Sequence, residues 1–248
     1  MNETLIDLLL SLPAVLLSLT IHECAHGWVA FRLGDPTARD LGRLTLNPMR
    51  HLDPLGALSL LFFHVGWAKP VPINPRNFKR PRAGMALTAF AGPFSNFLLA
   101  LFSAFLFLLI ELPAEAVYRA SGSTPGFLFL YYLVQFFYLL HLMNLMLALF
   151  NRLPLTPVDG SRILYLFLPK RAYFWFIRHE RQIYIFVLIW LIGGAYLADF
   201  LLEIPAVASS PVLSGLVSFL SLTGWIGSAA KAISAFMIRL FLKLPFLT

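Results

Sequence analysis

Cysteine and charge are both scarce in this 248-residue sequence. The single cysteine, Cys24, excludes a disulfide framework and any zinc finger built from cysteines. Charged residues make up 12% of the chain, about half the share found in an ordinary soluble domain. Disorder is excluded as well, because 59% of the residues are apolar or aromatic and disordered chains need low hydrophobicity with high charge. No Gly/Ser-rich linker separates a second domain, so residues 1–248 are predicted to form one domain.

Most of the sequence consists of apolar runs, and a run of about 20 residues is long enough to cross a bilayer. The runs predicted to span the membrane are residues 5–31, 84–110, 127–150, 183–202 and 212–240. The last run contains Gly224, Gly227 and Lys231, so it is either one tilted helix or a span plus a surface helix. A sixth run, 55–67, is shorter and is predicted to be re-entrant or half-buried. The expected fold class is an all-α polytopic membrane protein with about five to six transmembrane helices.

Two loop segments are predicted to be extended rather than helical. In residues 41–46, Leu41, Leu44 and Leu46 precede an Asn-Pro pair, which favours a short strand followed by a turn. Residues 70–81 contain four prolines, each of which removes a backbone donor and opposes a regular helix. Short extended or β segments are therefore expected near the functional site.

The positive charges predict the sidedness of the protein. Of the 19 Lys and Arg residues, 15 lie in two segments, residues 32–82 and 151–181. By the positive-inside rule both segments face the cytoplasm, which places the N-terminus outside and the C-terminus inside. The net charge of +7 is then mainly a topology signal, and no nucleic-acid partner is expected because no recognition module accompanies it.

The first predicted span contains the sequence HECAH at residues 22–26. On a helix, His22 and His26 share one face and can bind one zinc ion, and Glu23 stands beside them as a general base for water. Ionisable groups are costly inside a membrane, so they are functional candidates by default. The alternative is that these residues are polar groups of the bundle interior that hydrogen-bond to one another.

A catalytic zinc site needs a third protein ligand. Asp159 follows the third full span on the same predicted side as His26, and Pro154 and Pro157 stop a regular helix before it. His141 is a rival third ligand, because its predicted depth in the membrane is greater than that of His26 but close to that of His22. Spacing alone leaves both candidates open.

The motif HECAH at residues 22–26, followed by NRLPLTPVDG at residues 151–160, resembles the site-2 protease family of intramembrane zinc metalloproteases. The stretches LNPMRHLDPLG, GWAKPVPIN and AGPFSN are also similar to the compact branch of that family, which lacks PDZ and CBS domains. The resemblance implies a catalytic core at about residues 5–165 and additional C-terminal helices at about 182–245. It further implies one Zn²⁺ per chain, with His22, His26 and Asp159 as ligands and Glu23 as the general base. Thr156 departs from the family pattern, in which proline is frequent at this place.

Several asparagines and histidines allow either a role in the site or a role in packing. Small or polar residues recur every fourth position along the second full span, which predicts a close-packing ridge at Gly84, Thr88, Gly92, Asn96, Ala100 and Ala104. Asn151 and Asn96 are candidate amide donors to the oxyanion of the reaction, with an interhelical hydrogen bond as the alternative for each. For Asn144 the interhelical bond is the preferred interpretation. His51 and His64 are interpreted as loop or interface residues, and Cys24 as a packing residue.

The function expected from the resemblance is regulated intramembrane proteolysis, the hydrolysis of peptide bonds within or next to transmembrane segments. The expected partners are the lipid bilayer and a substrate's transmembrane segment, which pairs by strand addition with residues 41–46 or 71–74. The expected location is a prokaryotic cell membrane, with the active site near its cytoplasmic side. Two alternatives stay open, a metal or ion transporter that uses the His/Asp cluster and an inactive structural relative.

Overall fold

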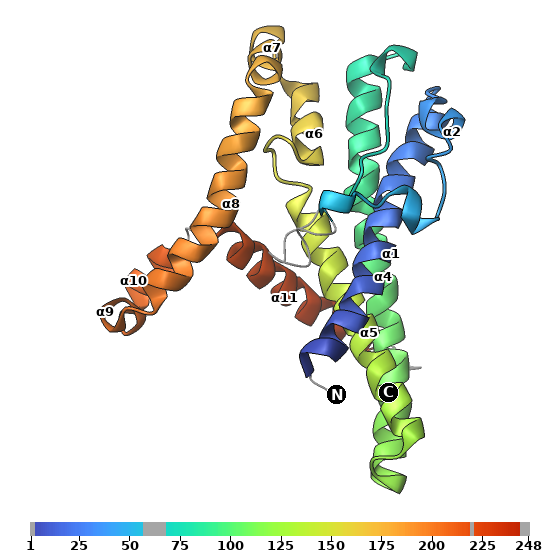
Figure 1. The fold of residues 1–248 in the computed structure, drawn as a ribbon, viewed down its shortest axis with the longest axis vertical. Helices are drawn as coiled ribbons and strands as arrows, with labels where there is room; N and C mark the ends of the chain where they lie inside the picture. The colour runs from blue at the N-terminus through green and yellow to red at the C-terminus, as the bar shows by residue number, and fades with distance from the viewer. Residues whose placement is uncertain (1–2, 57–67, 219–220, 244–248) are drawn as a thin grey trace.

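The computed structural model describes residues 3–56, 68–218 and 221–243, and this part of the chain is helical without a strand (Figure 1). The N-terminal half contains α1 (Glu3–Arg32), α2 (Thr37–Asp40), η1 (Pro48–Arg50), η2 (Pro75–Asn77), α4 (Pro81–Ser121) and α5 (Pro125–Phe150). The C-terminal half contains α6 (Asp159–Phe167), α7 (Lys170–Arg178), α8 (Glu180–Leu202), α9 (Pro205–Ala208), α10 (Pro211–Ser218) and α11 (Leu222–Phe241). The all-α fold class is confirmed.

Three helices of the described chain are long and apolar enough to cross a membrane, over Leu8–Arg32, Pro81–Ser121 and Pro125–Phe150. They belong to α1, α4 and α5, which pack side by side (Figure 1). The spans expected at 183–202 and 212–240 correspond to α8 and to α10 with α11, and their crossing of the membrane stays a prediction.

The predicted small-residue ridge forms the contact face of α4. All six of its members are buried: Gly84, Thr88, Gly92, Asn96, Ala100 and Ala104. Residues without bulky side chains let helix backbones approach closely, which explains how α4 packs against both α1 and α5. The helix continues through Pro93 and ends at Ser121, and its C-cap Gly122 has a φ of 66°, a conformation that glycine adopts without strain.

The last apolar run forms two helices rather than one. α10 ends at Ser218, and α11 begins after Ser221, whose Oγ accepts a hydrogen bond of 3.0 Å from the backbone N–H of Gly224. This N-cap satisfies a donor of the first turn and starts a new helix axis. α11 packs against α4 and α5 at one end and against α8 at the other, so it joins the α8 arm to the three-helix core (Figure 1).

The strand predicted over residues 41–46 is wrong. This segment consists of turns and bends. α2 ends at Asp40 with Leu41 as its C-cap, and Gly42 then has a φ of 64°, a conformation typical of a turn. Residues 69–74 form neither helix nor turn, and Asn74 has extended backbone angles, in agreement with the predicted extended segment. Residues 75–77 instead form the 3₁₀ turn η2, which Asn74 caps. Of the predicted re-entrant run at 55–67, residues 57–67 lie outside the described residues.

Candidate metal centre

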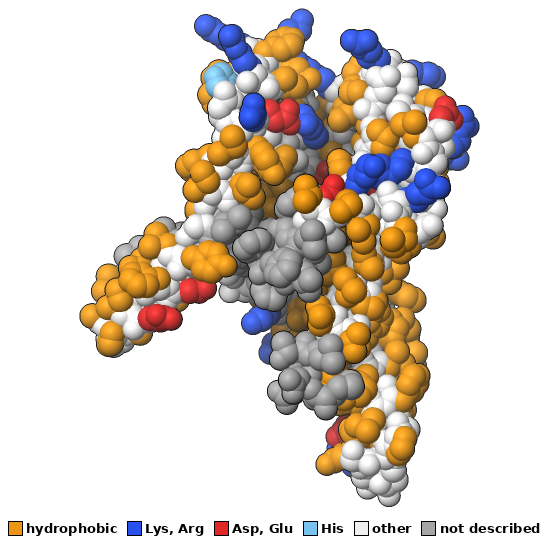
Figure 2. All heavy atoms as spheres, in the orientation of Figure 1, with side chains coloured by type: hydrophobic (Ala, Val, Ile, Leu, Met, Phe, Trp, Pro, Cys, Tyr) orange, Lys and Arg blue, Asp and Glu red, His pale blue; other side chains and the backbone are white. Residues whose placement is uncertain are grey.

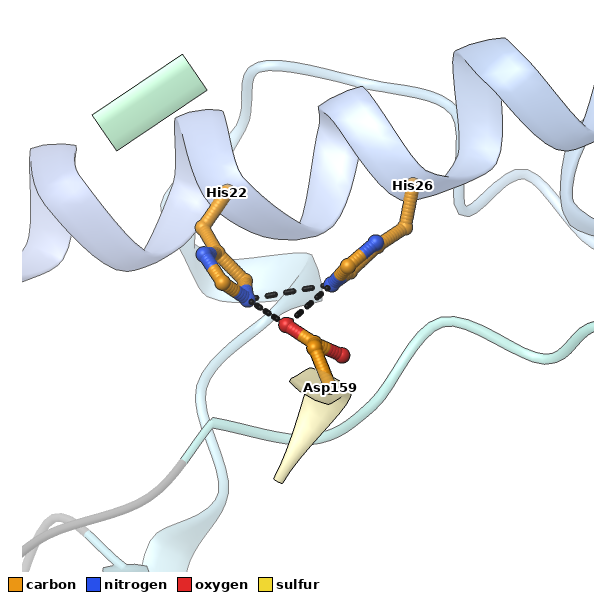
Figure 3. A group of neighbouring side chains, drawn as sticks. All are labelled: His22, His26 and Asp159. Carbon is orange, nitrogen blue, oxygen red and sulfur yellow. Dashed lines mark hydrogen bonds and ion pairs between the residues drawn. The ribbon is translucent and has the colours of Figure 1, made fainter. Parts of the chain in front are cut away.

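Three side chains from distant parts of the chain meet at one point (Figure 3). His22 and His26 project from α1, and Asp159 is the first residue of α6. The Nε2 atoms of the two imidazoles lie 3.0 Å apart. The Oδ2 atom of Asp159 lies 3.1 Å from His22 Nε2 and 3.2 Å from His26 Nε2. The candidates chosen from the sequence are thus brought together within the described part of the chain.

The outer nitrogen of each imidazole is held by α4. His22 Nδ1 donates to Asn96 Oδ1 at 2.5 Å, and His26 Nδ1 donates to the Thr88 carbonyl oxygen at 2.7 Å. Because these acceptors require a proton on Nδ1, the Nε2 of each neutral imidazole carries a lone pair. Two lone pairs therefore point at each other across 3.0 Å, an arrangement that repels unless a cation lies between them.

The carboxylate adds a third electron donor to the same point. An aspartate carboxyl ordinarily has a pKa of about 3.9 and is therefore an anion at neutral pH. The Oδ2 atom of Asp159 is buried and has no conventional hydrogen-bond donor. An anionic oxygen and two imidazole lone pairs converge, so the site is built for a cation.

The donor set and its spacing fit zinc. Two imidazole nitrogens and one carboxylate oxygen are typical ligands of a catalytic zinc ion, which keeps a fourth position for water. A tetrahedral ion with bonds of about 2.0–2.2 Å separates its ligand atoms by roughly 3.3–3.5 Å. The observed separations of 3.0–3.2 Å are slightly smaller, so a small outward movement of the side chains accommodates the ion.

Both imidazoles pack closely against Gly92 of α4. A Cβ atom at this position would lie 2.5 Å from His26 Cε1 and 2.6 Å from His22 Cε1. Only glycine leaves room for the two rings, each of which belongs to a residue 6% exposed. The sequence placed Gly92 in the packing ridge but gave no sign of its contact with the ligands.

A buried amide network surrounds His22. The Asn96 amide donates to Asn144 Oδ1 at 2.6 Å and to the Ser18 carbonyl at 3.3 Å while its Oδ1 accepts from His22. Asn144 in turn donates to Ser18 Oγ at 2.8 Å, which links α5 to α1. Both N–H groups of Asn96 have acceptors, and its Oδ1 accepts from His22, so the residue orients the His22 ring, while its oxyanion role stays a prediction. The interhelical interpretation of Asn144 agrees with these bonds.

Asp159 is positioned by a tight turn between α5 and α6. The N–H of Gly160 donates to the Asn151 carbonyl at 2.7 Å. A Cβ atom at residue 160 would lie 2.3 Å from the Leu153 carbonyl oxygen and 2.4 Å from that of Arg152. A side chain at residue 160 would collide with these backbone atoms, which explains the glycine after the carboxylate. The predicted interruption of the helix at Pro154 and Pro157 is observed, since α5 ends at Phe150 and α6 begins at Asp159.

The Glu23 carboxylate points to the extended segment at residues 69–74. Its Oε2 accepts a hydrogen bond of 2.8 Å from the backbone N–H of Val71.

The segment at residues 69–74 is anchored by Asp35, which is fully buried. Its carboxylate accepts hydrogen bonds from the Asn74 N–H and from the Asn77 amide, both at 2.7 Å. Burial raises the pKa of Asp35, but these bonds and those from Thr37 outweigh it and lower the pKa.

The roles of Asp35 and Val71 were not predicted from the sequence. The sequence Asp35-Pro36-Thr37 is typical of a turn that an aspartate side chain stabilises, and it could have marked Asp35 as a local anchor. No local pattern could reveal its bonds to Asn74 and Asn77, about 40 residues further along the chain.

The remaining candidates lie elsewhere. His141, the rival third ligand, is fully buried. It bonds to the Ala100 carbonyl at 2.8 Å and to Ser234 Oγ at 2.9 Å, so it joins α5 to α4 and α11 and is not part of the candidate metal centre.

Asn151 caps α5, and its amide donates to the Leu147 carbonyl at 3.0 Å, while its oxyanion role stays a prediction. His51 is a buried loop residue that donates from Nε2 to the Thr45 carbonyl, and His64 lies outside the described residues.

Comparisons with known proteins add independent information. A sequence model of peptidase family M50 matches residues 11–192. The chain is 45% identical over 150 residues to YwhC of Bacillus subtilis (strain 168), a protein named as a zinc metalloprotease; the alignment covers 60% of this chain and 65% of YwhC.

Rip2 proteins from two mycobacteria, also named as zinc metalloproteases, are more distant relatives. The chain is 31% identical over 149 residues to Rip2 of Mycobacterium tuberculosis, covering 58% of this chain and 52% of Rip2. It is 30% identical over 118 residues to Rip2 of Mycolicibacterium smegmatis, covering 46% of this chain and 45% of Rip2. The chain thus spans less than two thirds of the length of each relative. No solved structure matches it.

Proposed function

The chain belongs to peptidase family M50, and from this premise we propose that it is a zinc metalloprotease of the site-2 type that cleaves membrane proteins within or next to their transmembrane segments. The observation that carries the proposal is the convergence of His22 Nε2, His26 Nε2 and Asp159 Oδ2. Glu23, the residue after the first ligand, supplies a carboxylate on the same helix.

The proposed roles follow from the chemistry of these side chains. His22, His26 and Asp159 would hold the zinc ion, which when bound polarises a carbonyl group and lowers the pKa of water towards about 7. Glu23 accepts the proton of the attacking water and later delivers it to the leaving amine. The Val71 N–H holds the Glu23 carboxylate in one orientation, and Asn96 with the Thr88 carbonyl keeps both Nε2 atoms unprotonated.

The position of the site in α1 supports an intramembrane substrate. α1 contains one of the three helical segments long and apolar enough to cross a membrane, and both histidines are within it. His26 lies six residues before Arg32, the end of α1, which is about 9 Å along the axis. A substrate helix reaching this depth has to unwind locally, because its carbonyl groups are otherwise engaged in helix hydrogen bonds. Residues 71–74 are the extended segment proposed to hold the unwound chain.

The charge distribution supports a site near the cytoplasmic side. Most Lys and Arg side chains in Figure 2 lie in its upper half, where α7 and the first turn of α4 are found in Figure 1. Arg32 at the end of α1 begins the first basic segment, residues 32–82, and Asp159 lies within the second, residues 151–181. With Cys24→Ser as background, Arg76→Cys should react with a membrane-impermeant maleimide in inside-out vesicles and not in intact cells. Labelling of intact cells would reverse the proposed sidedness.

The function is tested by Glu23→Gln, which keeps the size of the side chain and removes its basicity. We expect cleavage of single-span substrates to fall by about 10²- to 10⁴-fold while the zinc content stays that of the wild type. Glu115→Gln is the matched control, because Glu115 is exposed and pairs with Arg119 at the opposite end of α4. Undiminished cleavage by Glu23→Gln would overturn the proposed function, and a transporter that uses the His/Asp cluster would not require this carboxylate.

A further inference from the structure

A buried pair of hydroxyl groups closes the turn that carries Asp159. Thr156 Oγ1 and the Tyr165 hydroxyl lie 2.7 Å apart, in residues that are 2% and 4% exposed. Thr156 lies three residues before Asp159, and Tyr165 lies in the second turn of α6. The hydrogen bond therefore joins the two ends of the segment that presents the carboxylate.

The Tyr165 ring is held from its other side by α7. Its centroid lies 5.8 Å from that of Tyr173, edge to face, and 5.9 Å from that of Phe176. The Arg82 guanidinium of α4 lies 4.3 Å from the centre of the Tyr173 ring and donates to the Leu168 carbonyl after α6. A continuous series of contacts thus runs from the start of α4 through α7 and Tyr165 to the turn.

Backbone hydrogen bonds also hold the turn. The hydrogen bond from Gly160 N–H to the Asn151 carbonyl closes its base, and the one from Val158 N–H to the Leu155 carbonyl is local. Thr156 precedes Pro157, whose ring restricts the backbone of the residue before it. The hydrogen bond to Tyr165 adds a side-chain contact with α6, which the backbone bonds of the turn do not supply.

We propose that Thr156 and Tyr165 form a positioning pair that holds the turn of Asp159 in the geometry needed to bind zinc. The proposal rests on the proposed function, in which Asp159 is the third ligand. Partners that orient a metal ligand from behind contribute about 10- to 100-fold to metal affinity in other proteins. The pair acts through the backbone and not on the ligand itself, so an effect at the lower end, about tenfold, is expected.

The experiment measures the zinc dissociation constant of the full-length protein in nanodiscs by competition with a chelator. Thr156→Val keeps the shape of the side chain and removes the hydroxyl, and Tyr165→Phe does the same for the ring. Each should weaken zinc binding about tenfold, and the double variant should be no weaker than either single variant, because both substitutions remove one shared bond. Thr156→Ser keeps a hydroxyl at this position and should bind zinc as the wild type does.

Two controls separate the possible outcomes. Tyr173→Phe removes a hydroxyl from the neighbouring ring but keeps its packing on Tyr165, so its zinc affinity should be unchanged. Wild-type affinity in Thr156→Val and Tyr165→Phe, or additive losses in the double variant, would overturn the positioning pair. Asp159→Ala tests the proposed function separately: if this variant keeps its zinc, the ligand assignment fails, whatever the other variants show.

Discussion

The two sides of the metal centre are built differently. The histidines come from a long helix and pack on Gly92, and their outer nitrogens are bound by Asn96 and Thr88 of a second long helix. Asp159 comes from a turn outside these helices, and its side chain is 20% exposed against 8% for each imidazole. The histidine side is thus fixed by helix packing, whereas the carboxylate side depends on a short loop.

Asp159→Ala should have the largest effect of all, because it removes the anionic ligand and leaves two neutral imidazoles. We expect zinc content close to zero and no cleavage of single-span substrates, measured by metal analysis and gel assay on the same preparation. Asp53→Ala, which removes a carboxylate from a loop turn, serves as a control. Normal zinc content in Asp159→Ala would mean that the carboxylate side contributes no ligand.

Gly92→Ala should be next, since it breaks the histidine side without removing a ligand. The added methyl group would lie 2.5–2.6 Å from both rings, so the imidazoles have to move apart. We expect zinc affinity to fall by about 100-fold. Gly126→Ala on α5 is a matched control because its nearest contact would be 3.9 Å away. Equal affinities of the two variants would contradict the tight packing of the rings on α4.

Asn96→Ala tests the orientation of a single imidazole. It removes the acceptor of His22 Nδ1 and two donors of the buried network, so the His22 ring can rotate. We expect zinc binding to weaken by about 10- to 100-fold, with Asn96→Asp retaining more affinity because it keeps an acceptor oxygen. If Asn96→Ala bound zinc normally but lost catalysis, the residue would act on the substrate and not on the ligand.

Asp35→Asn should have the smallest effect, and its effect should depend on pH. The pKa of Asp35 is lowered on folding, so its charged form stabilises the protein above the ordinary carboxyl pKa of about 3.9. This contribution is lost as pH falls through the lower pKa of the folded state. The difference in apparent Tm between wild type and Asp35→Asn should therefore be constant from pH 5 to 7 and shrink below about pH 4. A difference that is independent of pH would exclude a charged Asp35.

The sequence was sufficient for much of the histidine side. The spacing of His22 and His26, the apolar run around them and the small residues on α4 all follow from helical periodicity, which is a local property. The carboxylate side was predicted with less detail, because prolines mark where a helix stops but not the path that the chain then takes. The strand predicted over residues 41–46 was wrong for a similar reason: a strand needs a partner, and the sequence does not say which segment lies beside it.

By itself, the sequence determined that this is a helical membrane protein with a His-Glu-x-x-His helix and an aspartate in a proline-bounded turn, since composition, periodicity and helix breakers act over a few residues. Only the tertiary structure decided that Asp159 and not His141 meets the imidazoles, that Asn96 orients His22, and that Asp35 holds the segment bound to Glu23. These contacts join residues that are tens of positions apart. Their hydrogen bonds depend on how whole helices pack, which no local pattern of side chains specifies.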